Sequence, residues 1–304
     1  MTSTDARCLV CGGAPAGLTY PFGTIWGGRR FDYLRCRACG SSFLHPLPTA
    51  AEFAAMYDRS SYHDEYYAGG NEEEAVTFLP RVADRLPAGG SLLDFGCGNG
   101  AFLRTAARAS YDVAGVELEA SARANAQARS GRPVFALDEL LAGGRRFDII
   151  HMGDVLEHLP DPAGTMRQLE ALLSARGVFF IEGPLEDNRS TVFWAARLFG
   201  AAKNIRGKPL HGSLPPFHLF RTHAKAQRAF FEQRLGYTVE RFIVDESGWP
   251  YWNGERLREA RGAGQLLKMV IGRAGVTLAH ATAPAGLRIG NRFAAVLRPV
   301  SPAS

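Results

Sequence analysis

The sequence has no long hydrophobic run and few cysteines, and both absences restrict what the chain can be. No apolar stretch approaches the roughly 20 residues that a membrane-spanning helix needs. The first residues, Met1 to Arg7, lack the apolar segment of a secretory signal. The 304 residues include 5 cysteines, a number that cannot pair evenly into disulfides. These features predict a protein of the reducing cytoplasm without a transmembrane segment.

A strong charge, internal repeats and low-complexity tracts are also missing. The net charge is only +5, and much of it comes from arginines scattered among acidic residues. Such a distribution does not by itself indicate a nucleic-acid partner. The 46% of hydrophobic and 21% of charged residues are typical of a globular protein with one large and one small domain. No feature specifies an oligomeric state.

Four of the five cysteines form two pairs with metal-ligand spacing. Cys8 and Cys11 belong to one C-x-x-C-G knuckle, and Cys36 and Cys39 belong to a second. The two residues between the cysteines let both thiolates reach one ion, and two knuckles complete a tetrahedral site. We therefore predict a zinc ribbon over residues 1–45 with a structural Zn²⁺ ion, without which so small a unit cannot fold. A redox pair is the alternative, which the lack of a surrounding βαβ pattern disfavours.

The centre of the sequence is a strand, a glycine-rich turn and a helix in immediate succession. Residues 91–95 form a short apolar strand that includes Asp94. The turn that follows has the pattern G-x-G-x-G, at Gly96, Gly98 and Gly100. A dinucleotide site needs G-x-G-x-x-G, with room for a pyrophosphate at the helix N-terminus. The observed spacing favours a ligand that lies against the turn without a pyrophosphate.

Two further strands follow at the spacing of a βαβ fold. Residues 111–117 end in Glu117, whose carboxylate can accept hydrogen bonds from both hydroxyls of a ribose. Residues 147–152 form the other strand, and a segment that includes Leu156-Glu157-His158 comes after it. Together with the glycine turn, this series resembles the S-adenosylmethionine-dependent methyltransferases with a Rossmann-like fold, including the quinone O-methyltransferases.

The resemblance implies an α/β fold with a seven-stranded, mostly parallel sheet and an antiparallel last strand. The methyltransferase domain would cover residues 91–304, after the ribbon and a helical linker over residues 46–90. An insertion around residues 184–221 is expected at the carboxyl edge of the strands, where ligands of α/β folds bind, and we interpret it as a substrate lid, with an ordinary surface excursion as the alternative. The remaining strands are expected at residues 133–136, 177–182, 237–244 and 293–297. Helices are expected at residues 71–86, 119–129, 162–173, 190–199 and 224–235, and a basic helical run ends near Arg273.

The resemblance also implies a binding site for S-adenosylmethionine. The residues that it assigns to the cofactor are Asp94, Gly96, Gly98, Gly100, Glu117, Leu118, Asp138, Met152 and Tyr67. Tyr67 is the last of a group of tyrosines that precedes the domain, and a similar group occurs in methyltransferases with an N-terminal zinc ribbon. Packing of the ribbon onto the main domain is the alternative role of these tyrosines.

Methyl transfer from a sulfonium is an in-line displacement, in which the enzyme aligns donor and acceptor and keeps water out. A hydroxyl or carbon acceptor must also lose a proton, so a general base is expected. The candidates are His158, after the fourth strand, and His218, which the resemblance places on the acceptor side. A helix cap or a packing group is the alternative role of each histidine. Cys97 is interpreted as a packing residue, because methyl transfer needs no covalent step.

Two classes of methyl acceptor fit the resemblance. The first is an oxygen or carbon centre of a small molecule, such as a sugar nucleotide, a natural product or a quinone-like intermediate. The second is RNA, because some rRNA guanine methyltransferases carry an N-terminal four-cysteine ribbon. Enzymes that methylate exocyclic amines commonly carry Asn/Asp-Pro-Pro-aromatic after the fourth strand, where this chain has Gly153-Asp154-Val155-Leu156. This difference disfavours methylation of an exocyclic amine but does not exclude ring nitrogens. We therefore predict a small-molecule acceptor rather than a nucleic acid, and an RNA methyltransferase that uses the ribbon to recognise RNA is the alternative.

Overall fold

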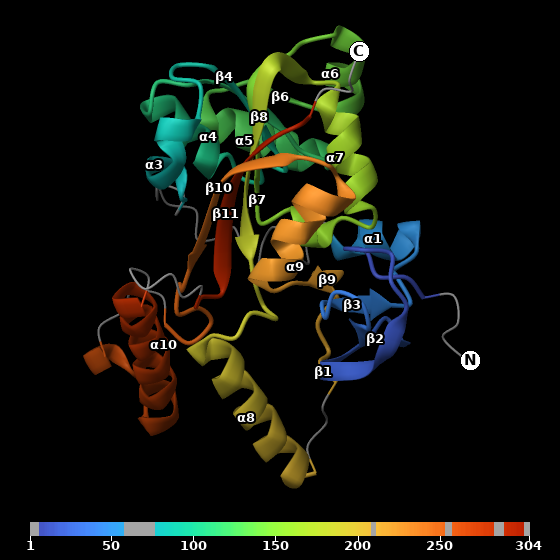
Figure 1. Ribbon diagram of the computed structural model, residues 1–304, viewed down its shortest axis with the longest axis vertical. Helices are drawn as coiled ribbons and strands as arrows, with labels where there is room; N and C mark the ends of the chain where they lie inside the picture. Colours follow the sequence, from blue (N-terminus) through green and yellow to red (C-terminus); the bar gives the residue numbers. More distant parts are fainter. Residues whose placement is uncertain (1–5, 58–76, 208–210, 253–256, 283–288, 301–304) are drawn as a thin grey trace. The chain divides into compact units, whose positions relative to one another are not determined.

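The computed structural model describes residues 6–57, 77–207, 211–252, 257–282 and 289–300. Figure 1 shows the helices and strands coloured along the sequence. The chain divides into two compact units, and each unit combines several separate stretches of the sequence. The first unit comprises residues 1–47, 184–230 and 243–293, and the second comprises residues 48–183, 231–242 and 294–304. Among the described helices, none combines the length and the hydropathy that a membrane crossing requires.

A seven-stranded sheet forms the core of the fold. Its order is β10 (Thr238–Asp245), β11 (Arg292–Arg298), β8 (Leu173–Pro184), β7 (Phe147–Gly153), β4 (Ser91–Phe95), β5 (Asp112–Val116) and β6 (Val134–Phe135). The five strands from β8 to β6 pair in parallel. The last strand, β11, is inserted between β8 and β10 and runs antiparallel, which confirms the predicted fold class. The strand order changes direction at β4, and ligands of open α/β sheets bind at such a point.

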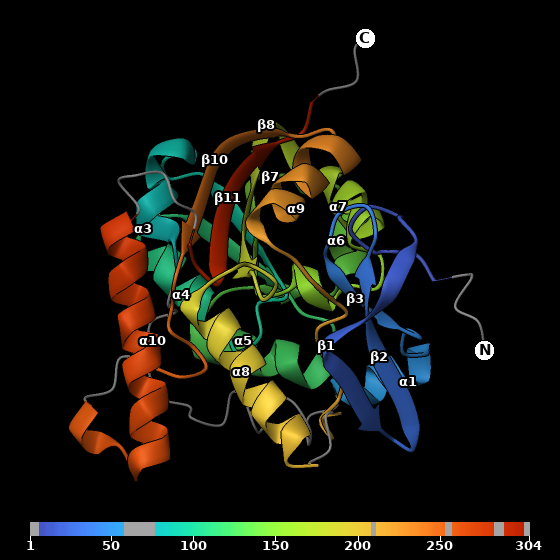
Figure 2. The same ribbon diagram turned by 60° about the horizontal axis from the view of Figure 1, so that its bottom comes forward.

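The middle of the sheet is buried on both faces, and its sequence reflects this. The paired residues Leu92, Leu93, Ile149 and Ile150 are fully buried, as continuous apolar runs in a parallel sheet should be. The strands are connected by α4 (Ala101–Arg108), α5 (Ala120–Ser130), α6 (Leu137–Gly143) and α7 (Pro162–Glu170). Figure 2 shows these helices around the sheet.

The segments before the sheet begin with α1 (Ala50–Met56). Thr49 caps this helix by accepting a hydrogen bond from the Glu52 amide, and the Glu52 side chain accepts one from the Thr49 amide. Of the helix predicted over residues 71–86, the described part forms α3 (Leu79–Val82) and a 3-10 turn (Ala83–Arg85). The rest of that predicted helix lies outside the described residues.

The first unit is built on a four-stranded sheet with the order β1 (Pro15–Trp26), β2 (Arg29–Cys36), β3 (Ser42–His45) and β9 (Phe220–Arg221). Its strands pair antiparallel. The fourth strand comes from far along the chain, because Ser42 pairs with Arg221 and Phe43 with Phe220. The predicted ribbon therefore gains an edge strand that the local sequence does not contain.

The remaining helices lie mainly in the first unit. The first unit contains α8 (Thr191–Ile205), α9 (Ala224–Ala229), a 3-10 turn (Leu257–Glu259) and α10 (Ala263–Thr282). A π-helical turn (Phe230–Arg234) follows α9. Helix α8 continues six residues beyond the predicted end at residue 199, and α10 continues beyond the basic run that the sequence indicated.

Candidate active site

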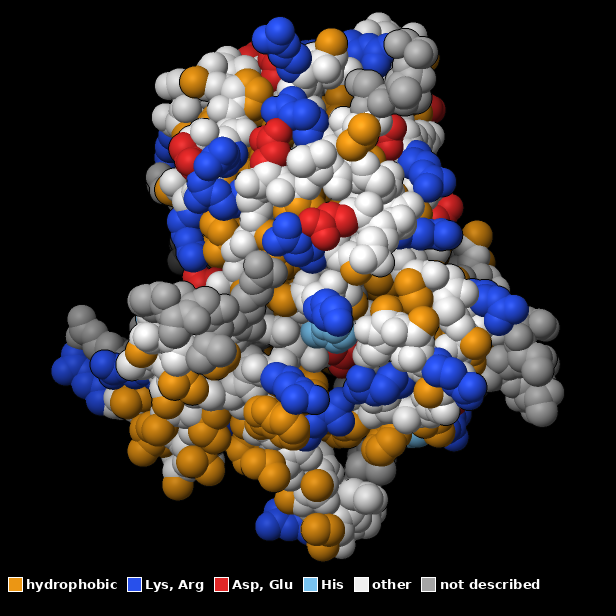
Figure 3. Space-filling model, in the orientation of Figure 1, with side chains coloured by type: hydrophobic (Ala, Val, Ile, Leu, Met, Phe, Trp, Pro, Cys, Tyr) orange, Lys and Arg blue, Asp and Glu red, His pale blue; other side chains and the backbone are white. Residues whose placement is uncertain are grey.

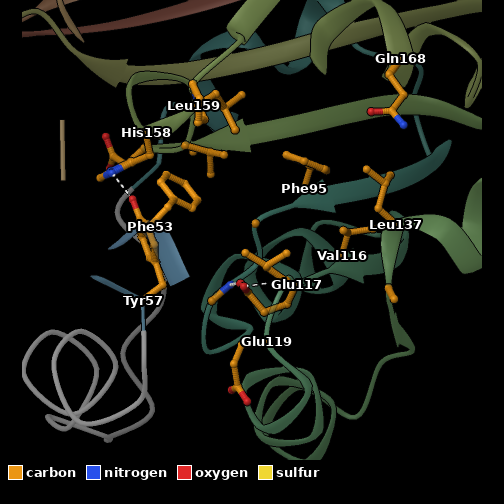
Figure 4. A pocket seen from close by; sticks show the side chains of 18 of the residues that line it. Phe53, Tyr57, Phe95, Val116, Glu117, Glu119, Leu137, His158, Leu159 and Gln168 are labelled. Atoms are coloured by element: carbon orange, nitrogen blue, oxygen red, sulfur yellow. Dashed lines mark hydrogen bonds between the residues drawn. The ribbon is translucent and has the colours of Figure 1, made fainter. Parts of the chain in front are cut away.

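A cavity of about 660 Å³ lies in the second unit, at the carboxyl ends of β4, β5, β6 and β7. Figure 4 shows how side chains from α1, from the strand ends and from α7 point into it. Most of the lining is apolar, and a few polar groups lie at its edges. The apolar and aromatic lining residues are Phe53, Tyr57, Phe95, Val116, Leu118, Ala136, Leu137, Leu141, Val155, Leu159 and Pro160. Such a lining suits a small organic ligand with a few polar groups.

The predicted glycine turn forms one wall of this cavity. Gly96 and Gly98 line it, and both have positive φ angles, of 77° and 52°. A Cβ atom at Gly96 would come within 2.7 Å of the Val155 Cγ2 atom. Glycine is therefore required at this position both for its backbone angle and for space. The bare backbone of the turn is exposed to whatever fills the cavity.

Glu117 follows β5 and lies beside the glycine turn. Its Oε2 atom accepts a hydrogen bond of 2.9 Å from the Gly98 amide, and its Oε1 atom accepts one of 2.7 Å from the Leu118 amide. Figure 4 shows the first of these bonds at the edge of the cavity. A carboxylate has about four acceptor sites, which is the chemistry that a pair of ribose hydroxyls needs.

The structure divides the predicted cofactor residues into two groups. Gly96, Gly98, Glu117, Leu118 and Asp138 line the cavity together. Three predicted residues are not among the described lining residues: Asp94, Gly100 and Met152. Gly100 caps α4, and Met152 is fully buried in β7. Tyr67 lies outside the described residues.

His158 lines the same cavity, and a 3-10 turn (Leu156–His158) positions it directly after β7. Its Nδ1 atom lies 2.9 Å from the Tyr57 hydroxyl. A dashed line in Figure 4 marks this hydrogen bond. Its Nε2 atom lies 3.8 Å from the Glu157 Oε1 atom. Tyr57 is itself packed against Phe53, with 4.9 Å between the ring centroids. The imidazole is thus oriented by a phenol and stands beside a carboxylate.

His218, the other predicted base, belongs to the first unit. Its Nδ1 atom lies 2.7 Å from the Glu186 Oε2 atom, and its backbone carbonyl accepts a hydrogen bond of 2.6 Å from the Tyr33 hydroxyl. The Nε atom of Arg221 lies 3.3 Å from the same Glu186 oxygen. The N-cap of α9 is His223, whose side chain accepts a hydrogen bond from the Ala226 amide. The capping role therefore belongs to a different histidine.

A buried histidine that the sequence analysis did not single out lies among the central strands. The Nδ1 atom of His151 is 2.7 Å from the Asp94 Oδ1 atom, and its Nε2 atom is 3.2 Å from the Glu182 Oε1 atom. Glu182 also accepts hydrogen bonds from the Thr77 hydroxyl and the Phe78 amide. The parallel register of β4 and β7 pairs Asp94 with His151. An acidic residue and a histidine at matching positions of two neighbouring strands were therefore the signal from which this contact could have been predicted.

The two carboxylates determine the charge of His151. Burial alone disfavours the imidazolium, but the hydrogen bonds and charges of Asp94 and Glu182 outweigh it and raise the pKa of His151 to about 9. In return, despite burial, the hydrogen bond and charge of His151 lower the pKa of Glu182. The carboxylate of Asp94, in the strand directly before the glycine turn, is therefore paired with His151 in the protein interior.

The four cysteines of the two knuckles come together in the first unit. The sulfur atoms of Cys8 and Cys39 are 3.7 Å apart, and those of Cys11 and Cys36 are 3.4 Å apart. All four sulfur atoms lie within 4.8 Å of one another. Zn–S bonds of about 2.3 Å in a tetrahedron place sulfur atoms roughly 3.8 Å apart, so the cluster fits one such ion.

Comparison with known proteins shows that one family matches most of the sequence that forms the cavity. The family described as "Methyltransferase domain" matches residues 67–240, more than half of the chain. A ubiquinone biosynthesis O-methyltransferase of Serratia proteamaculans is 32% identical over 128 residues, which are 39% of this chain and 52% of that protein. The corresponding protein of Ralstonia nicotianae is 35% identical over 102 residues, 31% of this chain and 43% of the relative. The chain thus spans about half the length of the curated relatives it matches.

Solved structures with partial similarity were also found. A sugar N-methyltransferase from Streptoalloteichus is 28% identical, over 40% of this chain and 53% of that one, with a TM-score of 0.34. A structure described as SAM-dependent methyltransferases from Methanosarcina mazei is 15% identical, over 73% of this chain and 97% of that one, with a TM-score of 0.46.

Proposed function

This chain belongs to the methyltransferase-domain family, and we propose that it transfers a methyl group from S-adenosylmethionine to an oxygen or carbon centre of a small molecule. The observation that carries this proposal is the cavity at the carboxyl ends of the central strands. It combines a glycine turn, a carboxylate after the second strand of the motif and a histidine after the fourth.

The residues that line the cavity fit S-adenosylmethionine, the cofactor that the family implies. Gly96 and Gly98 offer bare backbone, Glu117 offers acceptors for ribose hydroxyls, and Leu118, Leu137 and Leu141 offer an apolar surface. The cavity of about 660 Å³ is within the usual range for sites of small ligands and cofactors. When bound, the cofactor supplies a methyl group on a positively charged sulfur. The protein holds the donor in place and excludes water around it.

We propose that a histidine takes the proton of the acceptor, and both His158 and His218 remain candidates. When Nδ1 of His158 donates to the Tyr57 oxygen, Nε2 is left as the atom that accepts a proton. The Glu157 carboxylate at 3.8 Å from Nε2 would then stabilise the resulting imidazolium. For His218, Glu186 would act in the same way at Nδ1.

The acceptor class is a proposal that the relatives support. Ubiquinone biosynthesis O-methyltransferases are among the relatives, and their names give O-methylation in the synthesis of a quinone. The Gly153-Asp154-Val155-Leu156 segment after β7 lacks the amine-methylating pattern. We therefore favour a hydroxyl or carbon acceptor of a quinone-like, natural-product or sugar-nucleotide intermediate.

We further propose that the cysteine cluster binds a structural Zn²⁺ ion through Cys8, Cys11, Cys36 and Cys39. The sulfur distances and the closed set of four cysteines support this assignment. The division into a ribbon (1–45), a linker (46–90) and a domain (91–304) with a lid around residues 184–221 also stays a proposal. Helix α8 occupies the centre of the proposed lid.

The proposed function can be tested with S-adenosylmethionine labelled in its methyl group. The full-length protein is incubated with separate sets of catechols, sugar nucleotides and bulk RNA, and the label is followed into each. We expect label in a small-molecule product and none in RNA. Transfer into RNA, in a salt-dependent manner, would contradict the proposed acceptor class. Cofactor binding without transfer to any acceptor would contradict the enzymatic assignment.

A further inference from the structure

Helix α8 carries a hydrophobic stripe on its outer face. Trp194, Leu198, Ala201 and Ile205 recur at intervals of four, three and four residues, so they share one side of the helix. All four are exposed, and Trp194, Leu198 and Ile205 expose 53%, 70% and 86% of their surface. An ordinary surface helix has polar residues on this side.

The inner face of the same helix is apolar as well. Val192, Ala195 and Gly200 are buried. Gly200 lies against the ring of Tyr20 in β1, because a Cβ atom added at Gly200 would meet the Tyr20 Cε2 atom at 2.2 Å. The packing of α8 within its own unit therefore uses the inner face. The residues of the outer stripe do not contribute to the core of the first unit, so core packing does not explain why they are hydrophobic.

Helix α10 repeats this arrangement. Leu267, Val270, Ala274 and Leu278 recur at intervals of three, four and four residues, and all are exposed. Its opposite face is made of small or buried residues, which are Met269, Gly272, Gly275 and Ala279.

The two helices pack on each other within the first unit. A Cβ atom at Gly275 of α10 would meet the Thr191 Oγ1 atom at 2.0 Å, so the side chain of the first residue of α8 packs directly on the α10 backbone there. We call the exposed residues of both stripes the two-helix surface: Trp194, Leu198, Ala201 and Ile205 with Leu267, Val270, Ala274 and Leu278. Figure 3 shows hydrophobic side chains gathered over both helices.

Within the two helical segments every aspartate, glutamate, lysine or arginine position is basic, although Asp245 lies 3.5 Å from His280 of α10. Residues 191–206 contain Arg197, Lys203 and Arg206, and residues 261–282 contain Arg261, Lys268 and Arg273, with no aspartate or glutamate in either segment. Figure 3 shows lysine and arginine side chains beside the hydrophobic ones in this region. Arg197 lies over the rings of Tyr20 and Phe193, and the other five basic residues are exposed. The surface therefore combines large apolar side chains with five exposed positive charges.

We propose that the two-helix surface docks on an anionic lipid membrane and lies in its interfacial layer. Tryptophan and leucine on one side of a helix, with lysine and arginine near them, is the composition of helices that bind there. The basic side chains would contact lipid phosphates while the stripes enter the boundary of the acyl chains. A second copy of the chain fits less well, because a symmetric contact would bring like charges together.

Binding to lipid vesicles tests this proposal independently of methyl transfer. The full-length protein is floated with vesicles of phosphatidylcholine alone and with vesicles that also contain phosphatidylglycerol. We expect binding to the anionic vesicles, weakened by salt, since each basic residue near the surface contributes about fivefold to the affinity. The variants Leu198→Glu and Leu267→Glu should each weaken binding by about tenfold or more.

A matched control and a charge variant make the test specific. Leu18 of β1 is as exposed as Leu267, at 53%, and Leu18→Glu should leave vesicle binding unchanged. The double variant Lys268→Glu with Arg273→Glu keeps both stripes and should lose the preference for anionic lipid. The proposal is overturned if the wild type binds neither kind of vesicle, or if Leu18→Glu weakens binding as strongly as Leu198→Glu. Sedimentation showing a dimer that Leu198→Glu dissociates, without vesicle binding, would assign the surface to a second copy.

Discussion

Replacing His151 by glutamine should weaken the fold in a manner that depends on pH. The histidine is fully buried between Asp94 and Glu182, and its pKa is raised from 6.5 to about 9. A shift of one pKa unit corresponds to 1.36 kcal/mol of preference for one protonation state, so the imidazolium contributes about 3 kcal/mol to stability. The lowered pKa of Glu182 reflects the same interaction and is not counted again.

The direction of the pH dependence follows from the raised pKa. The folded state binds the proton more tightly than the unfolded state, so the contribution is complete below about pH 6.5 and is lost as the pH rises through about 9. In the variant, two buried carboxylates lose their cation, a change that costs about 3–5 kcal/mol in comparable sites. The difference in unfolding free energy between wild type and variant should therefore be large at neutral pH and shrink in alkaline solution.

Urea unfolding of both proteins between about pH 6 and pH 10 measures this difference directly. Comparison of the two proteins at each pH cancels the titration of all groups that they share. His280→Gln is a suitable control, because that histidine is 66% exposed and lies 3.5 Å from Asp245. A difference for His151→Gln that stays constant across the pH range would refute the assignment of a buried imidazolium.

Three further predictions concern the bases, the metal and the packing of α8. If His158 is the base, His158→Ala lowers turnover by about a hundredfold or more with cofactor affinity intact. If His218 is the base, His218→Ala has this effect instead. Full activity of both variants would exclude both histidines as the base. Metal analysis should find about one zinc per chain, and Cys36→Ser should abolish it; a folded, metal-free ribbon would rule the site out. Gly200→Val should lower the unfolding free energy by about 1–3 kcal/mol through overpacking, while the exposed Ala201→Val should change it little.

Local sequence was sufficient for the elements that depend on local patterns. The apolar runs of the central strands, the glycine turn and Glu117 were predicted from residues close together in the chain, and the structure has them in those positions. The two cysteine knuckles also follow from short spacing rules, and their sulfur atoms do cluster. These features could be predicted because each is determined by a few neighbouring residues.

The features that the sequence did not reveal depend on contacts between distant segments. The pairing of Phe220 with Phe43 adds an edge strand to the four-stranded sheet. This strand has only two residues, which are too few to show the alternating pattern from which a strand is predicted. The inclusion of Phe53 in the cavity wall requires the placement of α1, which amphipathicity alone does not give. The charge of His151 arises from Asp94 and Glu182, which lie 57 and 31 residues away in the chain.

Calorimetry of S-adenosylmethionine binding tests the central claim, that the cavity at the strand ends is the cofactor site. Wild-type protein should bind the cofactor, and Glu117→Ala should bind it roughly tenfold to a hundredfold more weakly through the loss of charge-assisted hydrogen bonds. Gly98→Val should abolish binding, because a side chain there would occupy the cavity and Gly98 has a positive φ angle. Asp84→Asn, which alters a carboxylate paired with Arg241, should bind like the wild type. Unchanged affinity in both Glu117→Ala and Gly98→Val would contradict the assignment of this cavity.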